Sequence, residues 1–134
     1  MLKLIKYVLG TLLLLAMVSF QSVGTLKGTW VYAGDIFNNK KEGAPKEYVL
    51  QRKYTDTGFT ALVLEKGYKP DEYETGRYRL TGDTCLETQT WCSQPSNLLN
   101  ITIHYHYIIR NDTLILNGVL PSGARTEEYW KRLK

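Results

Sequence analysis

The fold class of this 134-residue chain is clearest in residues 101–109, which read ITIHYHYII. Large apolar or aromatic residues recur at every second position of this stretch, namely Ile101, Ile103, Tyr105, Tyr107 and Ile109. The positions between them are Thr102, His104, His106 and Ile108. Because side chains alternate between the two faces of a β-strand, the pattern predicts a strand with one buried face.

Other runs of aromatic and β-branched residues are separated by Gly, Asn, Asp and Pro, which is typical of an all-β domain. The eight expected strands cover approximately 28–34, 46–54, 58–65, 73–80, 83–91, 100–109, 113–119 and 126–133. Turn-forming residues at 55–58 and 110–112 indicate antiparallel hairpins. No segment after residue 24 has sustained helical spacing, although residues 35–44 or 93–99 have room for a short turn of helix.

Eight consecutive antiparallel strands without covering helices either close into a barrel or pack as two sheets. We favour a single up-and-down barrel of eight or more strands. One closed sheet has no exposed edges, and its interior is filled by side chains or holds one small ligand.

Residues 1–24 have the organisation of a secretory signal peptide. Lys3 and Lys6 precede an apolar run from Tyr7 to Val18, and small residues follow up to Gly24. The run is shorter than the roughly 20 apolar residues that a membrane span needs, although an uncleaved anchor is the alternative. The sequence therefore predicts a signal peptide over 1–24, a barrel domain over 25–134, and a periplasmic or secreted protein.

The charge balance argues against a nucleic-acid partner. The whole chain has 17 basic and 13 acidic residues, but Lys3 and Lys6 lie in the leader, which leaves 15 basic against 13 acidic groups. Such a balance gives little electrostatic attraction to phosphate backbones. After signal cleavage, we expect no membrane partner either.

Export would place Cys85 and Cys92 in an oxidising environment, where a disulfide between them would persist. Residues seven apart point to opposite faces of one straight strand, so the bond requires a bend between them. Two free thiols are the alternative. A metal site is not expected, because the only histidines, His104 and His106, are distant in sequence and a Cys-x-x-Cys motif is absent.

Two terminal motifs, Gly28-Thr29-Trp30 and the run EEYWKR at 127–132, resemble the calycin superfamily, which contains the lipocalins and fatty-acid-binding proteins. Four central motifs are similar to those of small secreted bacterial lipocalin-like domains: Lys53–Phe59, Gly76-Arg77-Tyr78, Glu87-Thr88 and Asn111-Asp112-Thr113-Leu114. The resemblance implies a lipocalin-like barrel in which Trp30 opens the first strand and Arg132 packs over its ring. A guanidinium on an indole face gains a cation–π contact worth roughly 0.5–2 kcal/mol.

Alternation along the expected strands directs several polar side chains into the barrel. The expected ligand-binding residues are Arg52, Tyr54, Glu87, Tyr105, Tyr107 and Arg132, with Trp91 on the same inward face as Glu87. A buried ionised group must be paired or hold a polar ligand. An internal salt bridge from Glu87 to Arg52 or Arg132 is therefore the alternative to ligand contact.

No catalytic, cofactor or metal motif is recognisable in the sequence. We expect His104 and His106 on the outer face, and the acidic pairs Glu72–Glu74 and Glu127–Glu128 in solvent near strand ends. Glu87 beside a tyrosine is the only acid–base candidate, so an enzyme is the least favoured class.

The favoured function is the binding of a small amphipathic molecule in the barrel, without a cofactor. The alternative is a protein–protein interaction module with a barrel filled by side chains. An exposed apolar patch around Tyr68, Tyr73 and Ile108, combined with a full interior, would indicate the alternative.

Overall fold

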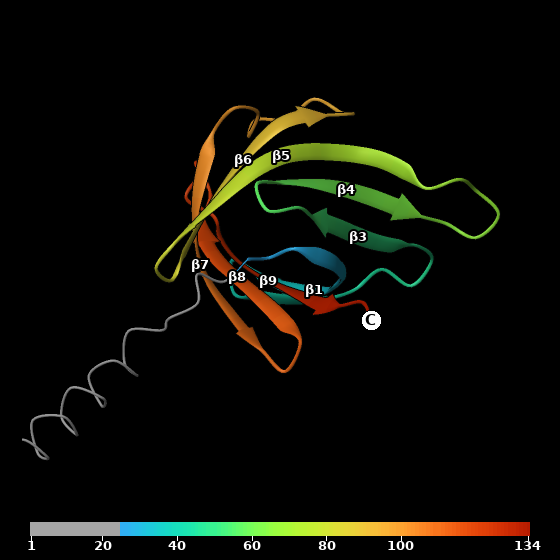
Figure 1. Ribbon diagram of the computed structural model, residues 1–134, viewed down its shortest axis with the longest axis horizontal. Coiled ribbons are helices and arrows are strands. Elements are labelled where there is room, and N and C mark those ends of the chain that lie inside the picture. Colours follow the sequence, from blue (N-terminus) through green and yellow to red (C-terminus); the bar gives the residue numbers. More distant parts are fainter. Residues whose placement is uncertain (1–24) are drawn as a thin grey trace, which may run out of the picture.

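The computed structural model describes residues 25–134, which form nine antiparallel β-strands (Figure 1). The strands are β1 (Gly28–Phe37), β2 (Lys40–Gly43), β3 (Val49–Tyr54), β4 (Gly58–Leu64), β5 (Asp71–Thr81), β6 (Thr84–Cys92), β7 (Thr102–Arg110), β8 (Thr113–Val119) and β9 (Arg125–Arg132). The expected leader over 1–24 lies outside the described residues. Within those residues, no helix is long and apolar enough to cross a membrane.

The strands close into the predicted up-and-down barrel. Sheet order is β2-β1-β3-β4-β5-β6-β7-β8-β9, and pairing of β1 with β9 closes eight of the strands into a ring. β2 is the additional strand, which pairs only with the second half of β1. The all-β prediction is confirmed.

The two regions proposed for a short helical turn contain none. Residues 35–44 form the end of β1, a turn and β2. Asn38 and Asn39 both have positive φ angles, 47° and 67°, and such a pair of residues matches the two-residue turn that suits the twist of a hairpin. Residues 93–99 form turns and bends after β6.

A bulge in β1 allows this strand to pair with three others, β2, β3 and β9. Its register against β9 shifts between Tyr32 and Gly34, and at this point its second neighbour changes from β3 to β2. Gly34 has a φ of +127°, and a Cβ there would lie 2.7 Å from the Glu42 carbonyl oxygen. Only glycine accommodates this close approach. After the bulge, odd-numbered residues of β1 turn toward the lumen.

One end of the barrel is closed by Trp30 and Arg132. Trp30 is fully buried, and its Nε1 donates a hydrogen bond of 2.8 Å to the Leu26 carbonyl. The Arg132 guanidinium carbon lies 4.2 Å from the centroid of a Trp30 ring, and Nη1 donates to the Lys27 carbonyl at 3.3 Å. Buried side chains behind this plug complete the core, among them Tyr54, Phe59, Tyr78, Leu114 and Leu116.

The predicted disulfide is wrong, because Cys85 and Cys92 are both free. Both belong to β6, which continues from Thr84 to Cys92 with one bulge at Thr90 and without the reversal that a bond requires. At roughly 3.3 Å per residue, they lie about 23 Å apart along the strand, whereas bonded cysteines need Cα atoms within about 7 Å. Cys85 pairs with Leu80 toward the closed end, and Cys92 pairs with Glu74 toward the other.

The two thiols should differ in reactivity. Burial raises the pKa of Cys85 to about 12, with Glu87 adding to the effect, whereas Cys92 is partly exposed. We expect iodoacetamide to alkylate Cys92 in the native protein and Cys85 only after unfolding, since the thiolate is the reactive form. Intact mass measurement without reductant should show one alkyl group on the native protein and two on the unfolded protein. An unfolded protein that takes up no alkyl group at either cysteine would contradict the assignment of two free thiols.

Candidate functional site

A buried guanidinium occupies the centre of the lumen. Arg52 is 7% exposed and points inward from β3, where Leu50, Arg52 and Tyr54 share one face. Its guanidinium carbon lies 4.7 Å from the ring centroid of Phe59 and 5.0 Å from that of Trp130. Aromatic side chains of the core therefore pack against the guanidinium.

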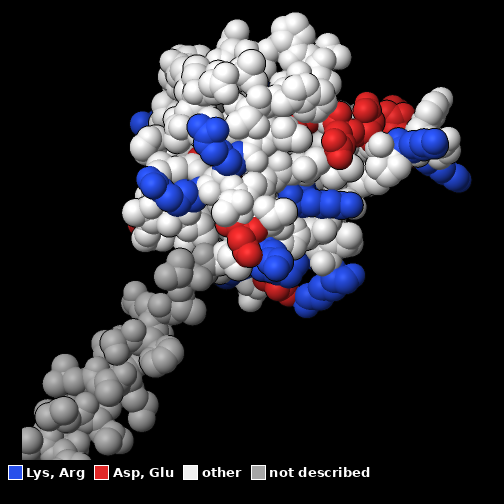
Figure 2. Space-filling model, turned by 45° about the horizontal axis from the view of Figure 1, so that its top comes forward, with Lys and Arg blue, Asp and Glu red and all other residues white. Residues whose placement is uncertain are grey.

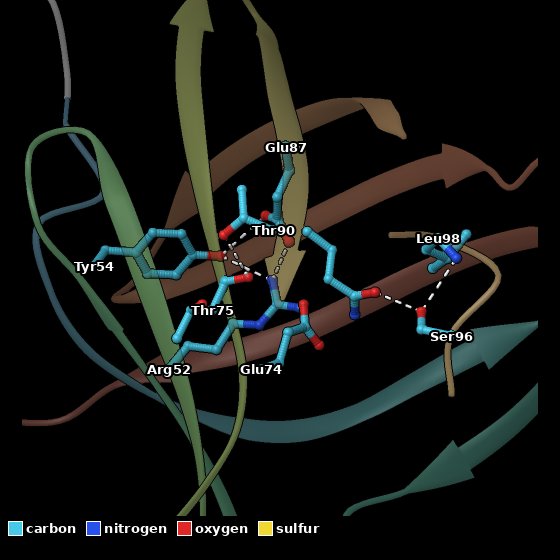
Figure 3. Close-up of polar contacts among 9 residues, drawn as sticks. Arg52, Tyr54, Glu74, Thr75, Glu87, Thr90, Ser96 and Leu98 are labelled. Carbon is cyan, nitrogen blue, oxygen red and sulfur yellow. Dashed lines mark hydrogen bonds and ion pairs between the residues drawn. The ribbon is translucent and has the colours of Figure 1, made fainter. Parts of the chain in front are cut away.

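Two carboxylates from neighbouring strands hold Arg52 (Figure 3). Its Nη1 donates to Glu87 Oε1 of β6 at 2.6 Å, and its Nη2 donates to Glu74 Oε1 of β5 at 3.4 Å. Tyr54 Oη accepts from Arg52 Nη1 at 3.1 Å and donates to Glu87 Oε2 at 3.3 Å. Burial lowers the pKa of Arg52, but the carboxylates, Glu87 foremost, raise it well above its ordinary value, so the guanidinium stays charged.

Two adjoining cavities lie around this network, away from the closed end. The first, of about 260 Å³, is lined by Asp35, Phe37, Arg52, Glu74, Glu87, Gln89, Leu98, Ile101, Ile103, Tyr105, Leu120, Thr126 and Glu128. The second, of about 370 Å³, is lined by Tyr32, Glu42, Gly43, Pro45, Tyr48, Leu50, Arg52, Tyr73, Glu74, Glu128 and Trp130. Arg52, Glu74 and Glu128 belong to both. The charged network therefore forms the common wall.

Four buried polar atoms in residues 25–134 have no hydrogen-bond partner: Asp35 Oδ1, Arg52 Nε, Glu128 Oε2 and Trp130 Nε1. All four belong to residues that line one or both cavities. Leaving a buried donor or acceptor unsatisfied costs about 1–3 kcal/mol each. The unpartnered side-chain polar atoms of the described residues are therefore concentrated on the walls of the lumen.

Glu128 is the carboxylate most disturbed by this environment. Burial raises its pKa from the ordinary 4.5 to about 6. Arg52 and the indole N–H of Trp130 oppose the shift, whereas Glu87 and Glu74 add to it. Neither Glu128 nor Asp35 forms an ion pair with any residue in the described part of the chain. The lumen thus contains carboxylates that Arg52 does not neutralise.

The structure brings only some of the predicted ligand-binding residues to these cavities. Arg52, Glu87 and Tyr105 line the first one, with Arg52 and Glu87 paired as the alternative interpretation expected. Tyr54 lies beneath them in the network. Tyr107 donates to the Gly82 carbonyl at 3.1 Å toward the closed end, and Arg132 belongs to the plug there.

Trp91 does not face the lumen as alternation predicted. It is 46% exposed, because the register of β5 against β6 shifts between Thr75 and Gly76, which pair with Trp91 and Gln89 respectively. The extra residue, Thr90, reverses the direction of the side chains that follow it. His104 and His106 are exposed, and His106 Nε2 lies 3.4 Å from Asp83 Oδ2.

Sequence reasoning missed four acidic residues that line the cavities: Asp35, Glu74, Glu128 and Glu42, which lies on the unpredicted strand β2. Glu74 and Glu128 were expected in solvent, yet each shares strand parity with residues assigned inward, Tyr78 and Trp130 respectively. Alternation alone was a sufficient signal for both. Asp35 had no such signal, because the Gly34 bulge shifts its parity relative to Trp30 and Tyr32.

Comparisons with known protein families and with curated proteins give no match for this chain. The number and order of the strands are compatible with a calycin-like fold. Within residues 25–134, no group of three or more His, Cys, Asp or Glu side chains is arranged to hold a metal ion. The chemistry of the lumen therefore has to be inferred from its own residues.

Arg52 and Glu87 should be energetically coupled. Removing one partner of a buried ion pair costs about 3–5 kcal/mol, largely because the other charge is left uncompensated. We expect Arg52→Met to lower the free energy of unfolding by about that amount, and Glu87→Gln in the same protein to restore part of the loss. Urea denaturation of the two single variants and the double variant measures the coupling. Strictly additive losses would contradict the network described above.

Glu128 should make the protein less stable as pH rises toward neutrality. Its pKa is higher in the folded state than the ordinary value, so the folded state binds the proton more tightly. The free energy of unfolding should therefore fall by about 2 kcal/mol as pH rises from about 4.5 through about 6. Glu128→Gln should remove this component, whereas Glu127→Gln, on the opposite face of β9, should retain it. Urea titrations across this pH range test the difference, and identical profiles for both variants would contradict it.

Proposed function

We propose that this protein is a lipocalin-like binding protein that holds a small amphipathic molecule in the cavities around Arg52. The observation that carries the proposal is the placement of every unpartnered buried side-chain polar atom of residues 25–134 on the walls of these cavities. A ligand with polar groups would satisfy them, whereas the rest of the core requires none. The proposal includes export to the periplasm or the exterior, as the leader over residues 1–24 predicts.

The lining of the first cavity suits an amphipathic molecule. Its charged wall of Arg52, Glu87 and Glu128 faces an apolar rim formed by Phe37, Leu98, Ile101 and Leu120. Phe37 and Ile101 are exposed, so the cavity reaches the surface at the rim. The lining is about evenly divided between polar and apolar side chains, so it is more polar than most small-molecule sites and suits a ligand with both kinds of surface.

Hydrogen bonds fix part of the polar wall of the first cavity. Gln89 accepts a hydrogen bond from the Ser96 hydroxyl, and Ser96 Oγ accepts one from the Leu98 backbone N–H at 3.1 Å (Figure 3). These contacts hold the segment after β6 against the lumen and place Leu98 at the rim. The rim is therefore attached to the same strand that supplies Glu87.

The interaction-module alternative is less well supported, because the lumen is not filled by side chains. Tyr68 and Ile108 are exposed, but Tyr73 lines the second cavity rather than an outer patch. One surface feature favours a protein partner: residues 88–109 contain no Lys, Arg, Asp or Glu, and Figure 2 shows an uncharged region at the top of the view. Elsewhere on that face, the basic and acidic side chains are interspersed (Figure 2).

Filling the first cavity should abolish ligand binding. Leu98→Trp adds a large side chain at the rim, and Leu99→Trp is the matched control, because Leu99 is 44% exposed and does not line the cavity. We expect native mass spectrometry of the protein recovered from its producing cells to detect a bound small molecule with wild type and Leu99→Trp, and a large loss of occupancy with Leu98→Trp. Near-ultraviolet circular dichroism verifies folding. Equal occupancy in all three proteins, or none in any, would overturn the proposal.

A further inference from the structure

The charges around the cavities are strongly unbalanced. Among residues 25–134, Arg52 is the only basic residue that lines either cavity, whereas the acidic lining residues are Asp35, Glu74, Glu87, Glu128 and Glu42, of which Glu42 pairs with Lys40 at 3.8 Å. The terminal nitrogens of Arg52 already bind Glu87 and Glu74, and its faces contact Phe59 and Trp130. An anionic ligand would therefore find only Nε of this guanidinium without a partner, and it would meet an excess of carboxylates.

Two carboxylates are available to a ligand. Glu128 Oε2 and Asp35 Oδ1 are buried without a hydrogen-bond partner, and neither side chain forms an ion pair with another described residue. A cationic group stabilises such a carboxylate by its charge, and a protonated amine also donates a hydrogen bond to it, which a quaternary ammonium group does not.

Aromatic side chains line the same space. Tyr32, Tyr48, Tyr73 and Trp130 line the second cavity, and Tyr105 lines the first. The indole N–H of Trp130, which is 3% exposed, has no partner at hydrogen-bond distance, but it lies close enough to Glu128 to lower the pKa of that carboxyl. Aromatic faces together with carboxylates are the usual chemistry for binding ammonium groups.

We propose that the lumen binds an amphipathic organic cation, an amine or quaternary ammonium compound, with its positive group at Glu128 and Asp35 and its apolar part at the rim. This inference rests on the proposed function and names its ligand class. The cation compensates the carboxylates that Arg52 leaves uncompensated, and an apolar chain would contact Leu98 and Leu120.

Binding should be coupled to ionisation of Glu128, whose pKa is about 6. The ionisable side chains around it come from several strands: Tyr32 and Asp35 of β1, Arg52 of β3, Tyr73 and Glu74 of β5, Glu87 of β6 and Tyr105 of β7. Burial raises the pKa of all three tyrosines, so they remain neutral. A cation favours the ionised form of Glu128, so its binding should release a proton near pH 6 and weaken as pH falls toward 5.

Four ligands with the same alkyl chain test the inference: decylamine, decyltrimethylammonium, decanol and decanoate, each below its micelle-forming concentration. Isothermal titration at pH 7 should show saturable binding of the two cations and at least about tenfold weaker binding of decanoate. Glu128→Gln and Asp35→Asn should each weaken decylamine binding by about tenfold or more. Glu127→Gln, with the same charge change on the outer face of β9, should leave it unchanged.

The outcomes separate the two levels of the proposal. If decanoate or decanol binds more tightly than the two cations, and Leu98→Trp still blocks that binding, the cation inference is overturned. The proposed ligand-binding function is then retained. Saturable binding of Ca²⁺ in preference to the amines would overturn the cation inference likewise. Absence of binding by all four ligands, together with an empty protein in native mass spectrometry, would overturn both. If Glu128→Gln does not fold, the coupling between cation binding and Glu128 ionisation can be tested on the wild type. Titration of decylamine in buffers of different ionisation enthalpy measures the protons released on binding, and no release near pH 6 would contradict the inference.

Discussion

The guanidinium of Arg52 cannot be buried alone, and the arrangement of the lumen follows from this constraint. Its charge requires compensation by carboxylates within the barrel, and these come from β5 and β6, which are distant from β3 in sequence. Only the closed ring of strands brings Glu74 and Glu87 to one guanidinium. The chain supplies more carboxylates there than one guanidinium neutralises, and this surplus distinguishes the site from an ordinary internal ion pair.

The two ends of the barrel differ in how fully their buried polar groups are satisfied. At one end, Trp30 is fully buried with its N–H satisfied, and Arg132 covers its ring. Around Arg52, by contrast, polar atoms are buried without partners. Proteins tolerate such local cost where the surrounding structure supports it, and they commonly do so at functional sites. The well-packed end therefore offsets the cost of the unpartnered groups around Arg52.

Strand parity was informative wherever the strands are regular. It correctly placed Arg52, Glu87 and Tyr105 on the inner face, and it also indicated Glu74 and Glu128, which were set aside only because charged residues near strand ends are usually solvated. Parity failed after bulges. Asp35 turns inward beyond Gly34, and Trp91 turns outward beyond Thr90, because one extra residue exchanges the two faces of a strand. The disulfide prediction failed for a different reason: both cysteines lie on β6, and the bulge at Thr90 does not reverse the direction of that strand.

Local patterns in the sequence determined the all-β class and most strand positions, since alternation and turn residues act over a few neighbouring positions. They left β2 unpredicted and favoured closure of the barrel without fixing it, and the resemblance of the terminal motifs to calycins implied the indole and the guanidinium at the closed end. The tertiary structure alone decided which carboxylates meet Arg52, where the cavities lie and which polar atoms remain unpartnered. These properties depend on register between strands far apart in the chain, and the register is set by bulges and closure rather than by any short segment.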